Sequence, residues 1–247
     1  MVKPILTMKL LGTTGMQQIK TLFVFLALSI SQVVYANLKP FEADYIGYRK
    51  GQKIGTAKQK LEHVSGNQYR LSYQSLASLF FLTDKRYETS HFVLKDNELI
   101  PQQYTYVRKG TGKDKSLDLQ FDVEQKIVNS KKGDVFEWDG ELDNLLYRFH
   151  FQQSLMSSQQ EFEYRIINNR AQYKTYKFKI LGEEKLTLPY GEIDTLKVQI
   201  VRASSSKRTT YIWFAPSLDY TMVRIEQYKE GKQQADVQLS SYSALTP

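Results

Sequence analysis

Cysteine is absent from all 247 residues. Disulfides and thiolate metal sites are therefore excluded, and so is the lipid-carrying cysteine that anchors a bacterial lipoprotein. Histidine is scarce as well, and His63, His91 and His150 are too far apart in the sequence for a zinc motif such as H-E-x-x-H. The sequence predicts no metal site and no cofactor.

A glycine-rich loop that holds phosphate is also lacking. The stretch VRKGTGKDKS, residues 107–116, comes nearest, but Val107 replaces the first glycine of such a loop and Asp114 replaces the serine or threonine that binds magnesium. Apolar and polar residues then alternate over 117–124, which is the period of a strand. Residues 107–116 are therefore predicted to form a solvated turn between two strands.

Long apolar runs are scarce, and the one over residues 22–34 is shorter than the roughly twenty apolar residues that span a bilayer. It is typical of a secretory signal peptide. We expect residues 1–36 to be that signal peptide, cleaved after Ala36. Met16 would also begin a signal of ordinary length, which leaves open a misassigned start for the first fifteen residues. The mature chain, 37–247, is expected to be periplasmic or secreted, with no transmembrane segment.

A strong charge of one sign is missing too. The chain has 34 lysines and arginines against 26 acids, a net charge of +8. Cleavage after Ala36 removes three lysines and no acid, which lowers the net charge to +5. No run of five or more basic residues occurs, so a nucleic-acid partner is not expected. The small excess favours anionic partners such as acidic lipids or envelope polysaccharides.

What the sequence has in quantity is tyrosine and phenylalanine, 17 and 13 residues, in short segments of period two separated by Gly, Asn, Asp and Lys turns. This pattern predicts an antiparallel all-β protein. The predicted strands are 41–48, 53–64, 68–74, 86–94, 102–108, 117–124, 126–131, 135–138, 161–168, 173–181, 184–187, 192–202, 208–214, 222–228 and 236–241.

One segment breaks this rhythm. Leu142, Leu145, Leu146, Phe149 and Met156 fall at helical spacing, with two acids in what would be the first turn, so an amphipathic helix is predicted near residues 141–156. The fold class that follows is mainly β: a single antiparallel, distorted or half-open β-barrel or sandwich over 37–247 with that one helix.

With the strands placed, a family resemblance becomes visible. The C-terminal half has a Gly-Glu strand element, a Pro-x-Gly turn and a Trp-x-Ala-Pro strand end, and the N-terminal half has matching positions. These are Gly182-Glu183, Pro189, Gly191, Trp213, Ala215 and Pro216, and then Gly51, Gly55, Glu88, Ser90, Pro101, Tyr104 and Phe121-Asp122. The chain resembles a bacterial exported family of unknown function, of the DUF3108 type. Met222 and Asp143-Asn144 depart from its pattern. The resemblance implies a secreted or periplasmic β-rich domain with no assigned reaction.

No catalytic motif stands out. There is no G-x-S-x-G elbow, and the serines at 204–206 are predicted to lie in a hairpin turn. Glu88, Glu183, Asp194 and Asp219 are conceivable members of a carboxylate pair for glycoside hydrolysis, but nothing selects one pair. We therefore expect a protein that is not an enzyme.

The most unusual stretch is LASLFFL, residues 76–82, followed at once by a charged cluster. One interpretation is a buried strand, or a loop packed over the end of a barrel. The other is a hydrophobic lip at the mouth of a cavity, where Leu79, Phe80 and Phe81 meet an apolar chain and Lys85 and Arg86 meet an anionic head group or polymer.

Strand aromatics allow two interpretations as well. Such residues usually fill a barrel or pack two sheets, but in a wide or half-open barrel they line a ligand cavity. The candidates are Tyr104, Tyr106, Tyr173, Tyr176, Phe178, Tyr211 and Trp213, and of these we include Tyr104, Tyr106, Tyr176, Tyr211 and Trp213 in the candidate ligand site.

Three functions follow in order of preference. The first is a non-enzymatic carrier that binds or escorts an apolar or amphipathic envelope molecule, such as a lipid or lipid-linked glycan. The second is an envelope structural or protein-interaction module, docking through a sheet edge or through basic turns near 109–115 and 207–208. The third is a polysaccharide hydrolase. Because a fold does not fix a function, the site has to decide between them.

Overall fold

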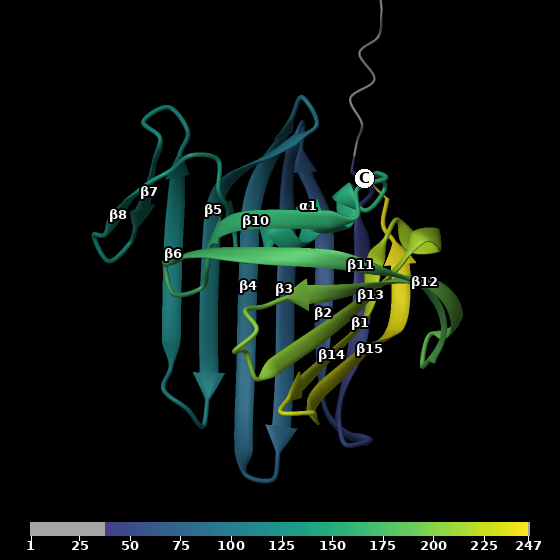
Figure 1. The fold of residues 1–247 in the computed structure, drawn as a ribbon. Coiled ribbons are helices and arrows are strands. Elements are labelled where there is room, and N and C mark those ends of the chain that lie inside the picture. The colour runs from purple at the N-terminus through teal and green to yellow at the C-terminus, as the bar shows by residue number, and fades with distance from the viewer. Residues whose placement is uncertain (1–37, 247) are drawn as a thin grey trace, which may run out of the picture. The chain divides into compact units, whose positions relative to one another are not determined.

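The computed structural model describes residues 38–246, and their backbone is a long series of strands with one α-helix (Figure 1). The signal peptide predicted for residues 1–36 lies outside the described residues. The strands are β1 (Phe41–Arg49), β2 (Gln52–Ser65), β3 (Gln68–Leu79), β4 (Leu82–Lys95), β5 (Glu98–Gly110), β6 (Lys115–Asp122), β7 (Ile127–Ser130), β8 (Val135–Glu137), β9 (Leu142–Asp143), β10 (Glu161–Ile167), β11 (Tyr173–Leu188), β12 (Gly191–Val201), β13 (Arg208–Ala215), β14 (Thr221–Lys229) and β15 (Lys232–Ala244). The helix α1 spans Leu146–Ser154, and a short 3-10 helix η1 spans Pro216–Leu218.

All fifteen described strands belong to one sheet, in the order β8-β7-β6-β5-β4-β3-β2-β1-β15-β14-β13-β12-β11-β10-β9. The first and last strands, β1 and β15, pair in the middle of the sheet and join its two halves. Neighbours are antiparallel except β9 and β10, which are parallel. Because β8 and β9 remain as edges within residues 38–246, the sheet is not closed. The predicted mainly β, half-open antiparallel fold is confirmed.

Alternation of side chains decides which face of each strand is buried. In β1, Phe41, Ala43 and Tyr45 are buried, while the residues between them are partly exposed. Short turns connect neighbouring strands, as at Glu230-Gly231, where both φ angles are positive as in the hairpin turns that match strand twist. The predicted turn within 107–116 is confirmed between β5 and β6.

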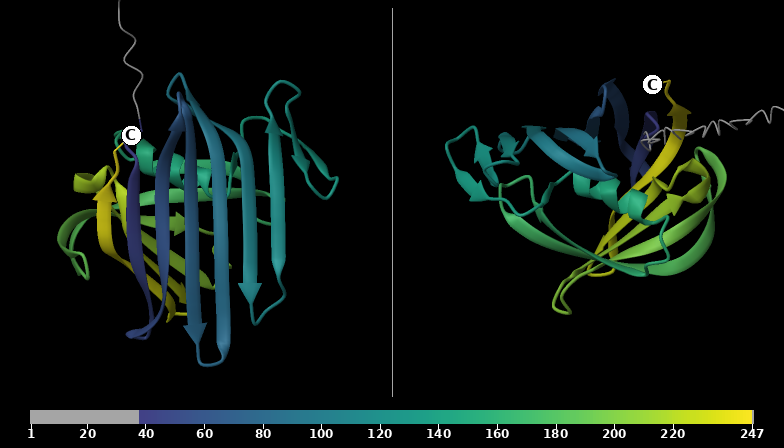
Figure 2. Two further views of the ribbon diagram at one scale, coloured as in Figure 1. Left: turned by 180° about the vertical axis from the view of Figure 1, so that it is seen from behind. Right: turned by 90° about the horizontal axis from the view of Figure 1, so that it is seen from above.

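The helix lies inside the curve of the sheet, between its two halves (Figure 2). Leu146 and Phe149 pack against the inner face of the N-terminal half, where the rings of Phe149 and Phe41 lie 6.5 Å apart. Phe151 stacks on Phe178 of the C-terminal half with the ring centroids 4.2 Å apart. The helix therefore joins the two halves through two apolar clusters.

The predicted bounds of the helix, 141–156, were too wide. Leu142 and Asp143 pair with β10 as β9, which removes them from the helix. One carboxylate oxygen of Asp143 accepts the backbone N–H groups of Leu145 and Leu146 at 2.8 and 2.9 Å, in the manner of a helix-capping side chain. The acid counted as part of the first turn thus lies just before it.

The C-terminal half curls further than the N-terminal half. A bulge between Ile180 and Gly182, where φ is +135°, changes the face on which the β11 side chains lie. The tip of the β11–β12 hairpin then reaches β15, because Tyr190 N–H donates to the carbonyl of Leu239 at 3.1 Å. Under this hairpin lies apolar packing that includes Trp213, on the sheet face opposite to α1.

Candidate functional site

A cavity of about 340 Å³ lies between α1 and the inner faces of both halves of the sheet. This is within the usual range for small-molecule pockets, about 300–1,000 Å³. It is lined by Tyr45, Ala57, Gln59, Tyr73, Arg86, Leu145, Tyr147, Arg148, Phe151, Gln152, Tyr176, Phe178, Ile200, Arg202, Thr210, Ile212, Phe214, Met222, Ile225, Gln227 and Val237. A larger depression of about 510 Å³ on the outer side of β1–β4 is shallow and open, so the inner cavity is the better candidate for a site.

The order of residues along β4 locates the cavity relative to the helix. Arg86 lines the cavity, Glu88 and Ser90 contact the segment that leads into α1, and Phe92 packs on the helix itself. Since β4 starts at the turn after β3, Arg86 lies between that turn and the helix. The cavity is therefore on the β3–β4 turn side of α1.

One wall of the cavity is apolar. Phe151 and Phe178 form a stacked pair, and Phe214 meets Phe151 edge to face at 5.4 Å. Ile212 and Ile225 are paired across β13 and β14 and extend this wall. Such a surface accommodates hydrocarbon and offers it no hydrogen bonds.

The cavity also has a positively charged part, formed by Arg86, Arg148 and Arg202. Among the described residues, no aspartate or glutamate lines the cavity. Arg86 is held by Asp84 through two hydrogen bonds of 2.9 and 3.0 Å. Asp84 also accepts from Arg108 at 3.0 Å, so one carboxylate serves two guanidinium groups. The cavity therefore keeps an excess of positive charge.

Arg148 and Arg202 have no carboxylate partner within ion-pair distance in the described part of the chain. Arg148 is exposed to solvent although Leu146, Tyr147 and Phe149 around it are buried, because its side chain faces the cavity. The Nε of Arg202 is buried without a hydrogen-bond partner among residues 38–246, and its Nη2 makes a long contact of 3.4 Å with the hydroxyl of Thr210. Guanidinium groups suit carboxylate and phosphate oxygens.

Partial removal from water acts to lower the pKa of Arg148, but Tyr147 and Glu88 outweigh that effect, and the pKa is raised. Arg148 is consequently a cation at any physiological pH. Burial likewise raises the pKa of Tyr45, whose hydroxyl donates to the carbonyl of Met222 at 2.9 Å. The cavity thus contains fixed positive charge and neutral phenols.

Behind the cavity a buried polar network secures the start of the helix. Glu88 accepts hydrogen bonds from the Tyr104 hydroxyl and the Asn144 amide, both at 2.7 Å. Asp143 accepts one from Ser90 at 2.7 Å. Both carboxylates are buried and satisfied largely by neutral donors, which fixes the helix to β4 and β5.

Burial raises the pKa of Asp143 to about 6, although the Leu146 N–H, Ser90 and the Leu145 N–H counteract it. Its second oxygen is buried without a hydrogen-bond partner among the described residues. This environment favours the neutral acid over much of the weakly acidic range.

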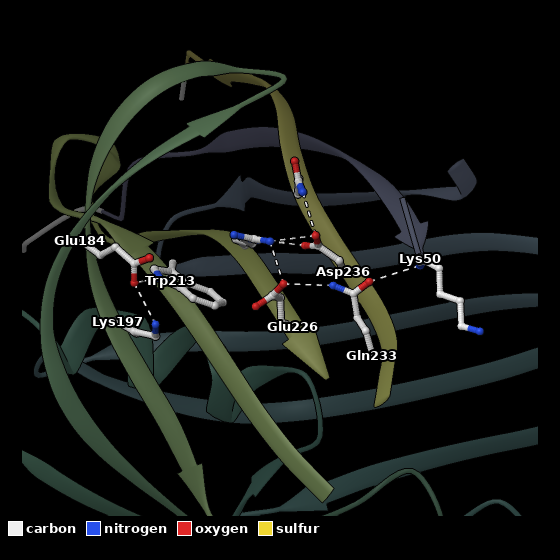
Figure 3. Close-up of polar contacts among 9 residues, drawn as sticks. Lys50, Glu184, Lys197, Trp213, Glu226, Gln233 and Asp236 are labelled. Atoms are coloured by element: carbon white, nitrogen blue, oxygen red, sulfur yellow. Dashed lines mark hydrogen bonds and ion pairs between the residues drawn. The ribbon is translucent and has the colours of Figure 1, made fainter. Parts of the chain in front are cut away.

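A second polar cluster lies on the opposite face of the C-terminal half (Figure 3). Trp213 donates its Nε1–H to Glu184 at 3.0 Å, and Lys197 and Arg224 lie 4.9 and 5.1 Å from its ring. Arg224 makes two hydrogen bonds of 2.9 Å to Asp236 and one of 2.7 Å to Glu226. Here each large polar group has its partner within the protein.

The sequence-predicted ligand site is only partly assembled. Arg86 and Tyr176 line the cavity. Tyr104 and Tyr106 are buried in the core behind it, and Tyr104 belongs to the polar network around Glu88. Tyr211 and Trp213 are on the other face of β13, because the residue that follows each of them, Ile212 and Phe214, faces the cavity. A strand presents alternate residues to one face, so the two sets cannot share a site.

The LASLFFL stretch is not buried, so the first interpretation of it was wrong. Leu79 ends β3, and Phe80 and Phe81 form the β3–β4 turn with 90% and 84% of their surface exposed. Lys85 pairs with Leu76 and faces away from the cavity, while Arg86 faces into it. The second interpretation, a lip that meets a ligand, remains a prediction.

The carboxylates considered for hydrolysis do not meet at the cavity. Glu88 is buried, Asp219 pairs with Lys39 at 3.0 Å, and Glu183 and Asp194 line a separate shallow groove. His150 contacts Tyr164 at 3.0 Å, and burial lowers its pKa. Residues 38–246 contain no cluster of three His, Cys, Asp or Glu side chains that would hold a metal ion.

Sequence reasoning missed Arg148 and Arg202. The helix was predicted from its apolar positions, and the pattern gives no sign of what its polar residues contact. Arg202 lies at the end of a strand before a serine-rich turn, where charge is usually solvated. The sequence does not reveal that β1 pairs with β15. This pairing joins the two halves of the sheet, so that the inner faces of both halves line one cavity.

Fold and site together define the class: an open antiparallel β-sheet that curls around a helix and an inner cavity. The model of the family described as "Protein of unknown function (DUF3108)" matches residues 41–237. The chain therefore belongs to the DUF3108 family, as the resemblance indicated. No curated protein shows significant sequence similarity to it.

Among solved structures, the chain is similar to a β-barrel-like protein of the domain of unknown function DUF1849 from Brucella abortus, with a TM-score of 0.59 and 7% identity over 85% of this chain and 100% of that one. An exported protein of Bacteroides fragilis with a YmcC-like fold gives a TM-score of 0.33 and 10% identity, over 84% and 97% of the chains. A lipoprotein of Parabacteroides distasonis gives 0.34 and 14%, over 83% and 96%. The first likeness concerns the fold alone, and the other two TM-scores are too low to support an argument.

The described residues contain no helix whose length and apolar character would let it cross a bilayer.

Proposed function

We propose that this protein binds an amphipathic molecule with an anionic head group and an apolar chain in the cavity beneath α1. The observation that carries the proposal is the lining of the cavity, which combines an aromatic and aliphatic wall with three arginines and no carboxylate among the described residues. A charge that a bound molecule covers loses its contact with water and then needs a partner. For Arg148 and Arg202 the ligand would provide it.

The two ends of such a ligand have separate places. An acyl chain would lie along Phe151, Phe178, Ile212 and Phe214, where removal from water contributes about 0.8 kcal/mol per buried CH₂. A carboxylate or phosphate would lie against Arg148 and Arg202. Glu88 is near enough to act on the charge of Arg148 but stays bound to Tyr104 and Asn144.

The proposed role is carriage rather than catalysis, in the periplasm or outside the cell, after removal of a signal peptide over residues 1–36. A general acid and base would have to reach the ligand, and the buried acids Glu88 and Asp143 are both outside the cavity lining. The raised pKa of Asp143 is explained by burial at the start of the helix. These features support a binding protein over the hydrolase alternative.

The interaction-module alternative has less support from the sheet edges. The edge strands β8 and β9 are three and two residues long. Short edge strands are a common means of preventing strand addition. A partner strand would find few free backbone groups there.

The test is to express the full chain in a bacterial host, purify it without detergent, extract it with organic solvent and analyse the extract by mass spectrometry. A stoichiometric anionic lipid or glycolipid is expected from the wild-type protein. The R148Q/R202Q variant should retain much less of it, and the R224Q variant, altered outside the cavity, should retain it. A clean wild-type extract, together with no binding of added single-chain anionic lipids, would contradict the proposal.

A further inference from the structure

The β-turns of this sheet gather at two ends, and the two ends differ in charge. Five turns lie at one end of the sheet: β1–β2, β3–β4, β5–β6, β12–β13 and β14–β15. Strand pairing and backbone hydrogen bonds next to these turns place each of them beside another turn of the set. We call this the basic end, defined as residues 49–53, 79–82, 109–115, 202–208 and 229–232. These residues include eleven lysines and arginines and two acids, a net charge of +9.

The other end has the opposite sign. Its turns are residues 65–68, 95–98, 122–127, 188–191 and 215–221, with two lysines and five acids, a net charge of −3. We call it the acidic end. The difference is large for a chain whose total charge is +8, because the turns of the basic end alone carry +9. Such an arrangement orients a protein toward a negatively charged surface.

The most exposed large apolar side chains of the described residues are also at the basic end. Phe80 and Phe81 are 90% and 84% exposed in the β3–β4 turn, and Leu82 beside them is 49% exposed. Phe80 has a φ of +55°, a conformation that is costly for a bulky residue. Two phenylalanines at the tip of a hairpin, one of them in this conformation, indicate a contact made outside the folded chain.

The neighbouring turn holds this aromatic tip in place. Thr111 N–H donates to the carbonyl of Thr83 at 3.0 Å, and Thr83 N–H donates to the Thr111 hydroxyl at 2.8 Å. Gly110 allows the approach, since a Cβ there would lie 2.2 Å from the carbonyl oxygen of Thr83. The β5–β6 turn, which carries lysines, is thereby bonded to the segment that carries Phe80 and Phe81.

From these observations we infer that the basic end docks on the surface of a bilayer that contains anionic phospholipids, with Phe80 and Phe81 inserted at the level of the head groups. Aromatic side chains suit that interface. Basic residues near it are attracted by acidic lipids with about 1 kcal/mol each. Strand pairing extends to Leu79 and Leu82 on either side of the two phenylalanines, and the Phe81 carbonyl accepts from the Thr111 hydroxyl at 3.4 Å.

The cavity lies on the β3–β4 turn side of α1, so a docked protein would direct it toward the membrane. Docking goes beyond the proposed ligand binding and does not require it, since neither Phe80 nor Phe81 lines the cavity. The two proposals can therefore fail separately.

The test is flotation of the full chain with vesicles of pure phosphatidylcholine or of an equimolar mixture of phosphatidylcholine and phosphatidylglycerol. Binding to the mixed vesicles is expected to exceed binding to the neutral ones by about tenfold or more and to weaken with added salt. F80S/F81S should lower the partition coefficient by about tenfold, and K109Q/K113Q by a similar factor. Both pairs are at turns, so folding should be preserved, which circular dichroism checks.

Matched controls come from the acidic end. V64S/V123S removes two exposed apolar side chains near its turns, and K95Q/K126Q removes two lysines from them. Both should bind like the wild-type protein. Absence of binding to the mixed vesicles would overturn the inference, and so would equal losses in the control variants. Loss in K109Q/K113Q with full binding by F80S/F81S would also overturn it and would indicate a site for a soluble polyanion.

Discussion

Arg224 on strand β14 and Arg148 on helix α1 differ in whether a carboxylate of the protein lies beside them. Arg224 is bound to Asp236 and Glu226 and lies against Trp213. Arg148 faces a cavity whose described lining contains no carboxylate. The same side chain thus has its partner within the fold at one place and lacks it at the other.

The difference separates stability from function. Where a polar group is satisfied inside the protein, its loss should lower the free energy of unfolding and leave binding alone. Where it is unsatisfied and faces a cavity, its loss should lower ligand affinity and leave stability unchanged. Binding sites often contain charged residues that have no partner within the protein. The residues that stabilise the fold and those that bind a ligand can therefore differ.

The largest effect is expected from R224Q. It leaves Asp236 and Glu226, both largely buried, without their shared cation. Breaking such a pair should reduce the free energy of unfolding by about 2–4 kcal/mol, measured by urea denaturation. The surface pair of Lys207 with Glu230 gives the control, because K207Q should cost less than about 1 kcal/mol. Equal stabilities for the two variants would contradict the structural role of Arg224.

The second effect concerns Asp143, which is buried at the start of α1 and lies outside the cavity lining. Its raised pKa of about 6 means that the folded protein binds a proton that the unfolded chain, with an ordinary pKa near 3.9, releases between these values. This contribution to stability is therefore fully present below about pH 4 and is lost as the pH rises through about 6, by an amount of up to about 3 kcal/mol.

D143N should flatten that part of the stability curve. The measurement is urea denaturation of wild-type and D143N proteins at intervals from pH 4 to 7, and their difference isolates Asp143 from the other titrating groups. D219N, altered at an exposed acid, should keep the wild-type slope. Parallel curves for the wild-type and D143N proteins would show that Asp143 is ionised throughout this range.

Third comes the cavity itself. R148Q/R202Q should bind an anionic single-chain lipid such as lysophosphatidylglycerol about tenfold more weakly. Its free energy of unfolding should match or exceed that of the wild-type protein, because two neighbouring cations that have no carboxylate partner are removed. Displacement of an environment-sensitive dye measures the affinity, and denaturation measures the stability. A large loss of stability without a change in affinity would place these arginines with Arg224.

The smallest effect is expected from Y45F. Tyr45 lines the cavity, but its hydroxyl already donates to the Met222 carbonyl. Its removal should cost about 1 kcal/mol of stability and leave lysophosphatidylglycerol affinity within the error of the dye assay. A marked loss of affinity instead would mean that lining the cavity, rather than lacking a partner, decides function.

The sequence predicted the strands well because each has a clear period of two. The errors in the predicted strand and helix bounds have local causes. Residues 184–187 were separated from 173–181 because Gly182 interrupts the alternation, although the bulge keeps β11 continuous to Leu188. The two-residue strand β9 is too short to show any period, and the helix was extended over it for that reason.

The site was harder to predict, since it depends on contacts between distant segments. Arg86 and Tyr176 were identified because they belong to unusual or aromatic stretches. Tyr211 and Trp213 were included because the sequence does not reveal which face of β13 meets the cavity. Arg148 and Arg202 gain their significance from an enclosed space that exists only after β1 pairs with β15 and α1 packs inside.

The most direct measurement is a comparison of lysophosphatidylglycerol with lysophosphatidylcholine in the dye-displacement assay, on the wild-type and R148Q/R202Q proteins. The two lipids share a single chain and differ in net charge. If Arg148 and Arg202 bind an anionic head group, the wild-type protein will bind the anionic lipid more tightly than the zwitterionic one. The variant will lose that preference while it still binds both lipids. No binding of either lipid, or equal preferences in the two proteins, would contradict the assignment of the cavity.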